Sequence, residues 1–250
     1  MTSSLPTKTP RTSLGAFVGA QSGNRTRTTF GQGILSPSRL PIPPSAHIIH
    51  YTRVMKQVWF FHGGESFSDY STYLTHLKAR NIDYDRLKNQ KKWRTWIAEQ
   101  IPEVDCLIPT LPNGDNAVYD EWKIMFEKFI PLFSDDVQLV GHSLGAMFLA
   151  KYLHEKRLEA PVRRIILVAP GYNKDELEDY GSFKLDSAKG VELSAQEIHL
   201  FHSKDDPAVP FRELAKFQSD IPSAITHVFQ DRGHFVDSTF PELLEIINKK

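Results

Sequence analysis

The sequence predicts an α/β protein with a mainly parallel central sheet and helices on both faces, and three observations carry this prediction. Short runs that are apolar throughout, such as 58–61 and 165–169, are typical of parallel strands buried on both sides. Segments with apolar residues at helical spacing lie between these runs. A glycine-flanked turn at 141–145 joins one such strand directly to a helix. Strands alternating with helices favour right-handed crossovers, which bring the carboxyl ends of the strands to one edge.

The expected elements follow one another from residue 55 onward, and apolar patterning and breakers define each of them. The first strand, 58–61, ends at two glycines. The helix expected at 88–100 carries Trp93, Trp96 and Ile97 on roughly one face, as a core helix does. The strands are expected at 58–61, 106–108, 136–140, 165–169, 197–202 and 225–229, and the helices at 70–78, 88–100, 118–133, 146–157, from near 211, and at the C-terminus.

Gly141-His142-Ser143-Leu144-Gly145 is a G-x-S-x-G motif between an expected strand and an expected helix. Its glycines leave room for a strained turn, so that the Ser143 hydroxyl projects at the top of the sheet above the helix N-terminus. This arrangement is typical of a nucleophile elbow. A serine between glycines also occurs in ordinary turns, so the remaining residues of the chain must decide.

An acid and then a histidine follow the serine, each after a late strand. Asp205 and Asp206 lie where the strand 197–202 ends, and Pro207 and Pro210 stop that strand before the next helix. His234 follows Gly233 just after the last strand. The order Ser143, Asp206, His234 is that of a hydrolytic triad in which the histidine is the base. Asp206 is the favoured acid because its position before a proline fixes its direction, and Asp205 is the alternative.

Other interpretations of these residues stay open at this point. The two aspartates also suit an acidic turn or a helix cap, and His234 also suits an exposed loop. If neither aspartate were the acid, the loop after Val168 would supply Asp175 or Asp179. The histidines at 199, 202 and 227 fall within strand-like runs, where a histidine is usually packed or exposed rather than catalytic.

The loop His62-Gly63-Gly64 after the first strand is a candidate for holding a negatively charged oxygen. Two fixed backbone N–H groups stabilise the oxyanion of acyl transfer by roughly 3–4 kcal/mol each. We expect these donors to be the amides of Leu144 and Gly64, with Gly63 as the alternative. A plain glycine turn is the other interpretation of the loop.

Composition and missing motifs exclude several other classes of protein. The chain of 250 residues with 40% hydrophobic residues has enough length for one substantial core and no apolar stretch long enough to cross a bilayer. We find no H-E-x-x-H, paired C-x-x-C or phosphate-binding G-x-x-x-x-G-K-[ST] motif, so neither metal nor cofactor is expected. The only cysteine, Cys106, cannot form an internal disulfide, and a cytoplasmic location is expected.

Residues 1–54 differ in composition from the rest of the chain. They contain six basic residues and no acid, so that this segment is +6 while the overall net charge is zero, and they show no sustained period; the basic residues are Lys8, Arg11, Arg25, Arg27, Arg39 and Arg53. We expect this segment to be disordered. A transit peptide, a nucleic-acid-binding arm and a misassigned start before Met55 are the competing interpretations. The last is favoured, because the segment lacks an amphipathic helix and aromatic interleaving and resembles conceptual translation across a transfer-RNA gene.

From Met55 to near the C-terminus the chain resembles the small serine hydrolases related to retinoblastoma-binding protein 9 and the bacterial YdeN-type predicted esterases. The resemblance implies a compact α/β-hydrolase domain at 55–250 with a serine nucleophile, the second aspartate as acid, and little or no lid. The loop after His62 varies among these relatives. The matching residues are His62-Gly63, Leu111-Pro112-Asn113 with Trp122, the motif at 141–145, Ser203-Lys204-Asp205-Asp206-Pro207 with Val209-Pro210, and Gly233-His234-Phe235.

These features predict a serine hydrolase, a carboxylesterase, that cleaves a small ester or an activated amide or thioester through an acyl-enzyme. No nucleic acid or membrane partner is expected, and no protein partner is indicated. The segment 171–193 is either a small lid or an acidic surface excursion with one short helix. The alternative function is a catalytically weak hydrolase fold that acts as a protein-binding module, because fold alone does not dictate function.

Overall fold

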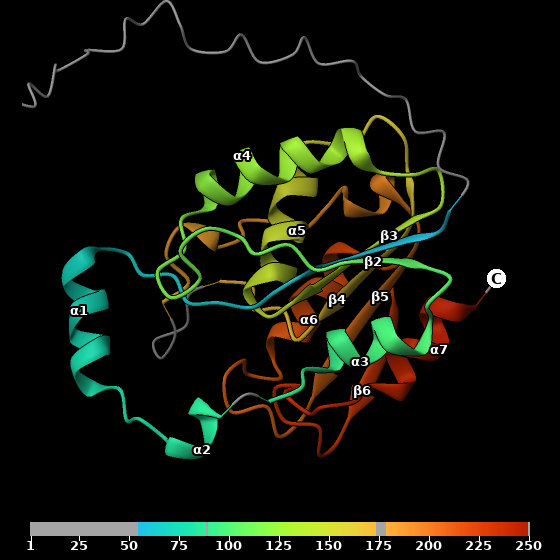
Figure 1. The fold of residues 1–250 in the computed structure, drawn as a ribbon. Helices are drawn as coiled ribbons and strands as arrows, with labels where there is room; N and C mark the ends of the chain where they lie inside the picture. Colours follow the sequence, from blue (N-terminus) through green and yellow to red (C-terminus); the bar gives the residue numbers. More distant parts are fainter. Residues whose placement is uncertain (1–54, 89, 174–178, 250) are drawn as a thin grey trace, which may run out of the picture. The chain divides into compact units, whose positions relative to one another are not determined.

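The computed structural model describes residues 55–88, 90–173 and 179–249, and their centre is a six-stranded sheet in the order β2-β1-β3-β4-β5-β6 (Figure 1). Every pair of neighbouring strands is parallel, as the apolar runs predicted. The strands are β1 (Gln57–Phe61), β2 (Asp105–Leu107), β3 (Val137–His142), β4 (Val162–Val168), β5 (Ala195–Ser203) and β6 (Ile225–Phe229).

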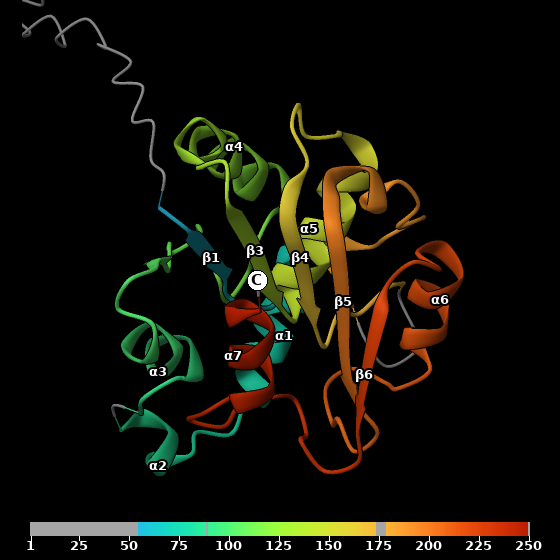
Figure 2. The ribbon, with the colours of Figure 1, turned by 90° about the vertical axis from the view of Figure 1, so that its right-hand side faces the viewer.

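Helices cover both faces of this sheet, as Figures 1 and 2 show. The helices α3 (Trp93–Gln100) and α7 (Pro241–Asn248) bury Trp93, Ile97, Leu243 and Ile247 against one face. The opposite face is covered by α4 (Tyr119–Phe129), α5 (Leu144–Glu155) and α6 (Glu213–Asp220). The remaining helical segments are α1 (Tyr70–Ala79), α2 (Tyr84–Leu87), η2 (Ile130–Leu132), η3 (Gly181–Phe183) and η4 (Val191–Ser194).

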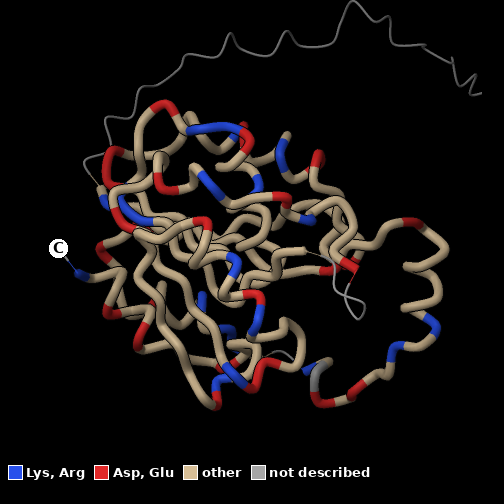
Figure 3. The backbone as a smooth tube through the Cα atoms, turned by 180° about the vertical axis from the view of Figure 1, so that it is seen from behind, with Lys and Arg blue, Asp and Glu red and all other residues tan. Residues whose placement is uncertain are grey.

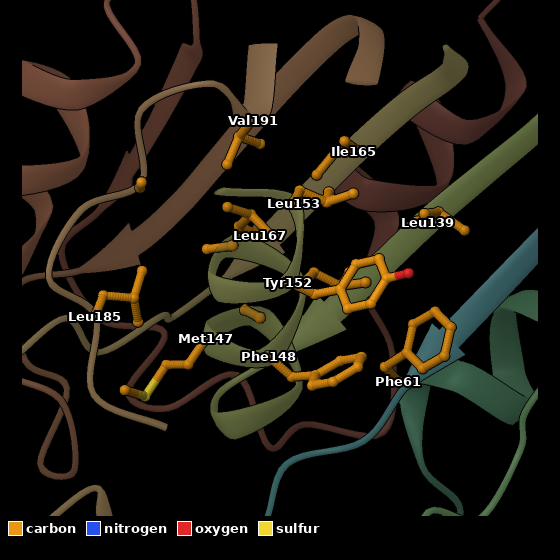
Figure 4. Close-up of a cluster of buried hydrophobic side chains, with 14 of the residues drawn as sticks. Phe61, Leu139, Met147, Phe148, Tyr152, Leu153, Ile165, Leu167, Leu185 and Val191 are labelled. Atoms are coloured by element: carbon orange, nitrogen blue, oxygen red, sulfur yellow. The ribbon is translucent and has the colours of Figure 1, made fainter. Parts of the chain in front are cut away.

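The larger core lies around α5, which is buried along most of its length (Figure 4). Phe148 and Tyr152 of α5 pack against Phe126 of α4, with ring centroids 5.3 and 4.8 Å from it. Phe61 of β1 lies 5.3 Å from the same Phe126 ring. The helix that begins just after Ser143 is therefore fixed by apolar burial on nearly every side, which gives the preceding turn a rigid base.

The chain adds β2 on one side of β1 and all later strands, from β3 onward, on the other side. The order of the strands therefore has a topological switch point at β1. Ligands of open α/β sheets bind at such a switch point, outside the carboxyl ends of the strands. The register pairs Phe61 of β1 with Gly141 of β3. The loop after β1 and the turn after β3 therefore begin at the same level.

Two helix predictions were wrong at their ends. The helix expected at 88–100 begins only at Trp93, and a separate short helix, α2, precedes it. Residues 88–92 are polar, so they have no apolar face to bury against the sheet. The helix expected at 118–133 ends at Phe129 and continues as the 3₁₀ turn η2, because Pro131 has no N–H to donate to an α-helical hydrogen bond.

The predictions for residues 1–54 and for Asp175 lie outside the described residues. Within the described part of the chain, no helix is long and apolar enough to cross a membrane. Lysine and arginine are interspersed with aspartate and glutamate along the domain in the view of Figure 3.

Candidate active site

Ser143 occupies a strained turn between β3 and α5. Its backbone has φ 54° and ψ −121°, which L-residues rarely adopt, and its amide donates to the Val168 carbonyl over 2.8 Å. A Cβ on Gly141 would lie 2.6 Å from the Gly145 carbonyl oxygen, so no larger residue fits there. The motif thus has the backbone geometry of a nucleophile elbow.

Gly145 permits a second close approach, this time between the elbow and β1. A Cβ on Gly145 would lie 2.4 Å from the carbonyl oxygen of Phe61 and 2.6 Å from that of His62. These are backbone atoms, which cannot move aside as a flexible side chain can. The helix start and the end of β1 are therefore in direct backbone contact.

Asp206 and His234 form the central polar contact at this edge of the sheet. The imidazole Nδ1 lies 2.8 Å from Oδ2 and 3.1 Å from Oδ1 of the carboxylate. The carboxylate also accepts from the backbone amides of Ala208 and Val209, at 2.8 and 3.0 Å. Burial alone raises the pKa of Asp206, but the hydrogen bond and positive charge of His234, together with these amides, bring the pKa below its usual value. Asp206 is therefore an ionised acceptor that holds the Nδ1–H tautomer of His234.

Asp205, the alternative acid, does not contact the imidazole. Its Oδ1 accepts from the Ser203 hydroxyl at 2.5 Å and from the Gly233 amide at 2.9 Å. The Ser203 hydroxyl oxygen accepts in turn from the Arg232 amide at 2.9 Å. Asp205 therefore fixes the loop that carries His234 rather than the ring itself.

His142, which the sequence analysis did not single out, connects the elbow to the same loop. Its Nε2 lies 2.8 Å from the carbonyl oxygen of His234, and the two rings are 5.0 Å apart. Because a carbonyl only accepts, Nε2 of His142 must carry the proton. Burial, and after it the neighbouring His234, lower the pKa of His142 to about 3, so this donor is neutral at physiological pH. Its position inside the G-x-S-x-G motif was the only signal available in the sequence.

No hydrogen bond joins the Ser143 hydroxyl to His234 in the structure, although His142, the residue before the serine, contacts His234. Such a bond is often long or poorly aligned in a site without substrate and shortens when substrate binds. The structure thus brings Asp206 to His234, and brings both to the edge at which Ser143 lies.

The glycine loop after β1 lies directly against Ser143. A Cβ on Gly63 would be 3.1 Å from the Ser143 Cβ, and a Cβ on Gly64 would be 2.5 Å from the Gly114 carbonyl oxygen. The next amide, that of Glu65, donates to the same Gly114 carbonyl at 2.9 Å. Among the described residues, no acceptor takes the amides of Gly63 or Gly64. The Leu144 amide is at the first position of α5, where the helix offers no acceptor.

The histidines at 199, 202 and 227 lie in strands, as their sequence patterns predicted. His199 and His202 are buried in β5, and burial lowers the pKa of each to about 4. His199 shares a hydrogen bond of 2.9 Å with His227 of β6, and His202 lies 3.2 Å from the Pro170 carbonyl oxygen. One ring nitrogen of each of these three histidines is thus bonded to a neighbouring residue.

The described part of the segment 171–193 is anchored to the domain rather than free. Phe183 is fully buried in the larger core. Asp179 accepts from the Ser68 amide at 2.8 Å, and a Cβ on Gly181 would be 2.3 Å from the Ser66 hydroxyl oxygen. Buried Glu213 of α6 accepts from the Tyr172 amide at 3.0 Å. Asp179 therefore joins this segment to the region after β1 and does not serve as the partner of His234.

In the described part of the chain, no group of three or more His, Cys, Asp and Glu side chains is arranged to hold a metal ion. Cys106 is free and half-buried, and burial, with the nearby negative charges of Asp105 and Glu103, raises the pKa of its thiol to about 11. At neutral pH it is a thiol and a poor nucleophile.

A family model described as serine hydrolase matches residues 86–248. The chain belongs to this serine hydrolase family. The serine hydrolase RBBP9 of Rattus norvegicus is 28% identical over 163 residues, covering 62% of this chain and 84% of the relative. The putative hydrolase YdeN of Bacillus subtilis is 26% identical over 159 residues, covering 61% of this chain and 82% of the relative.

Solved structures of serine hydrolase relatives share the fold. The crystal structure of the B. subtilis ydeN gene product superposes with a TM-score of 0.61 at 23% identity, covering 77% of this chain and 97% of that one. A YdeN-like hydrolase from Pectobacterium atrosepticum superposes with a TM-score of 0.52 at 14% identity, covering 78% and 91%. The α/β-hydrolase fold predicted from the sequence is confirmed.

Proposed function

We propose that this serine hydrolase is a carboxylesterase that cleaves an ester, or an activated amide or thioester, of a small substrate through an acyl-enzyme on Ser143. The observation that carries the proposal is the hydrogen bond between buried Asp206 and His234 Nδ1, beside a serine in elbow geometry. With Nδ1–H given to Asp206, Nε2 of His234 is left as the basic nitrogen.

In the first half of the reaction, His234 Nε2 takes the Ser143 proton as the serine oxygen bonds to the carbonyl carbon of the substrate. The carbonyl π electrons move to oxygen and give a tetrahedral oxyanion. The free amides of Leu144 and Gly64 donate to this oxygen, and each stabilises the oxyanion by roughly 3–4 kcal/mol. The Gly63 amide is the alternative donor if it, and not that of Gly64, faces the oxyanion. The intermediate then expels the alcohol, which takes the proton from His234.

In the second half, His234 removes a proton from water as the water oxygen attacks the acyl-serine. Collapse of the second tetrahedral intermediate releases the carboxylic acid and returns the proton to Ser143. Asp206 stays ionised throughout and stabilises the imidazolium that forms twice in each cycle.

Short p-nitrophenyl esters assayed with the full chain test this proposal. We expect turnover with burst kinetics and its loss in Ser143→Ala, which removes only the nucleophile. Well-folded wild-type protein that neither turns over these esters nor acylates would favour the alternative, a hydrolase fold that acts as a protein-binding module. We also propose a cytoplasmic location, for which the support is a single free cysteine.

A further inference from the structure

A small cavity of about 130 Å³ opens beside the serine, between the loop after β1, the N-terminus of α3 and the loop after His234. Gly63 and His142 line its inner side, and both are neighbours of Ser143 in space or in sequence. Phe235, the residue after His234, lines it as well. A substrate bonded to Ser143 therefore has this cavity within reach of a short chain.

The outer side of the cavity is basic, since it is lined by Lys92 and Arg94. The Arg94 guanidinium lies 5.4 Å from the centre of the Trp93 ring, and its Nε is buried without a hydrogen-bond partner. No carboxylate among the described residues pairs with it. Burial lowers the pKa of Arg94, as expected for a cation that lacks a counterion.

The other partly or fully buried arginines of the domain show what Arg94 lacks. Arg163 lies 3.1 Å from the Asp136 carboxylate, Arg164 lies 2.6 Å from Glu197, and Arg232 lies 3.2 Å from Glu242. Arg94 is half-buried, and burying part of a guanidinium without such a carboxylate partner costs free energy. Arg94 therefore lacks a carboxylate counterion within the described residues, as is typical of an arginine that binds an anionic ligand.

The remaining walls leave the positive charge unopposed. His142 is neutral, and the Trp93 indole N–H is already donated to the Phe235 carbonyl oxygen at 2.9 Å. The first turn of α3 contains no acidic residue, and the partial positive charge of the helix N-terminus adds to that of Lys92. An anion in this cavity would meet two cations, and no carboxylate is among the residues that line it.

Resting on the function proposed above, we propose that the substrate carries a carboxylate a few bonds from the scissile carbonyl and that Arg94 binds this carboxylate in the cavity. A carboxylate matches the planar fork of a guanidinium and forms two charge-assisted hydrogen bonds with it. The small size of the cavity limits the group to a carboxylate with a short linker. The carboxylate belongs either to the acyl part or to the alcohol part, and the substrates below distinguish the two.

Matched ester pairs test the proposal with the full chain. For the acyl side, kcat/KM of mono-p-nitrophenyl glutarate is compared with that of p-nitrophenyl pentanoate, in which a methyl group takes the place of the carboxylate. For the alcohol side, O-acetylglycolate is compared with 2-methoxyethyl acetate. We expect the anionic member of one pair to be preferred at least tenfold. Arg94→Met should remove that preference by lowering kcat/KM for the anionic ester.

Arg157→Met is the matched control, because it removes the same charge from an exposed position beyond the far end of α5. It should leave the preference intact, and Lys92→Met should reduce it less than Arg94→Met does. Hydrolysis of charged and neutral esters at equal kcat/KM in the wild type would overturn the anion site while leaving the hydrolase standing. So would a preference that survives in Arg94→Met.

Calorimetric titration with glutarate provides a readout that needs no turnover. We expect saturable binding to the wild type and to Ser143→Ala, and none to Arg94→Met. Binding without hydrolysis of any ester would support the anion site and contradict the proposed esterase activity. Absence of glutarate binding together with equal kcat/KM for both pairs would overturn the site.

Discussion

The imidazole of His142 donates from Nε2 to the backbone carbonyl of His234 over 2.8 Å. This contact crosses from the residue before the candidate nucleophile to the candidate base. It joins the loop after β6 to the elbow, in addition to the contact of His234 with Asp206. His142 is thus a positioning residue for His234.

We expect His142→Phe, which keeps a ring but removes the donor, to lower kcat by about 10- to 100-fold with little change in KM, because His234 loses its alignment. His142→Gln, which restores an N–H donor, should recover part of kcat. Steady-state kinetics on a p-nitrophenyl ester measures both. Equal kcat in His142→Phe and the wild type would show that the contact does not position the base.

The two adjacent aspartates should differ sharply in their effect on turnover. Asp206→Asn leaves the fold intact but removes the ionised acceptor, so we expect kcat to fall by about 10³- to 10⁴-fold. Asp205→Asn keeps an oxygen that can accept from Gly233, and it should lose far less. Kinetics combined with circular dichroism checks both variants. A dead Asp205→Asn beside an active Asp206→Asn would reverse the assignment.

Gly145 should tolerate no side chain. The Cβ of Gly145→Ala would lie 2.4 Å from the Phe61 carbonyl oxygen, so β1 or the elbow must shift, at a cost of about 1–3 kcal/mol of unfolding free energy. Gly114→Ala is the matched control, since its nearest neighbour would be the His62 side chain at 3.4 Å, an ordinary contact. Urea unfolding compares the two. Equal unfolding free energies would contradict the close packing of α5 on β1.

Three buried histidines should make the domain sensitive to mild acid. Burial lowers the pKa of His142 to about 3 and that of His199 and His202 to about 4, against about 6.5 in the unfolded chain. The unfolded state therefore binds more protons between these values, so their contribution is complete above pH 6.5 and is lost as pH falls toward 4. Carboxylates whose pKa is lowered in the folded protein, such as Asp206, change the free energy of unfolding only below about pH 4.

We expect the free energy of unfolding to fall by about 2–5 kcal/mol between pH 7.5 and pH 5. Urea titrations at a series of pH values measure this dependence. His199→Phe, which keeps the ring volume without a titrating group, should flatten the curve. An unfolding free energy that stays constant from pH 7.5 to pH 5 would contradict neutral buried histidines.

Local chemistry explains which features the sequence could predict. Apolar runs such as 58–61 and 165–169 define the parallel strands, and the glycines of the motif define the elbow, because each effect is confined to a few neighbouring residues. The start of α3 at Trp93 was not predicted. The polar residues before it are themselves good helix formers, and only packing against the sheet determines where this helix begins. The choice between Asp205 and Asp206 as partner of His234 needed the loop conformation.

The cavity beside Ser143 could not be predicted from the sequence at all. Arg94 belongs to α3 and Lys92 directly precedes this helix, whereas Gly63 follows β1 and His142 ends β3. These residues are far apart in the sequence, and no local pattern indicates that they line one cavity, because their proximity depends on tertiary packing. A helix that begins with basic residues is unremarkable until its neighbours are known.

If Ser143 is the nucleophile that His234 and Asp206 activate, a covalent inhibitor of serine hydrolases should label this residue. The full chain is treated with a fluorophosphonate, digested, and analysed by mass spectrometry. We expect one adduct, located on Ser143, with labelling at least 100-fold slower in His234→Ala and in Asp206→Asn. Labelling at another residue, or labelling of Ser143 at the wild-type rate in both variants, would contradict it.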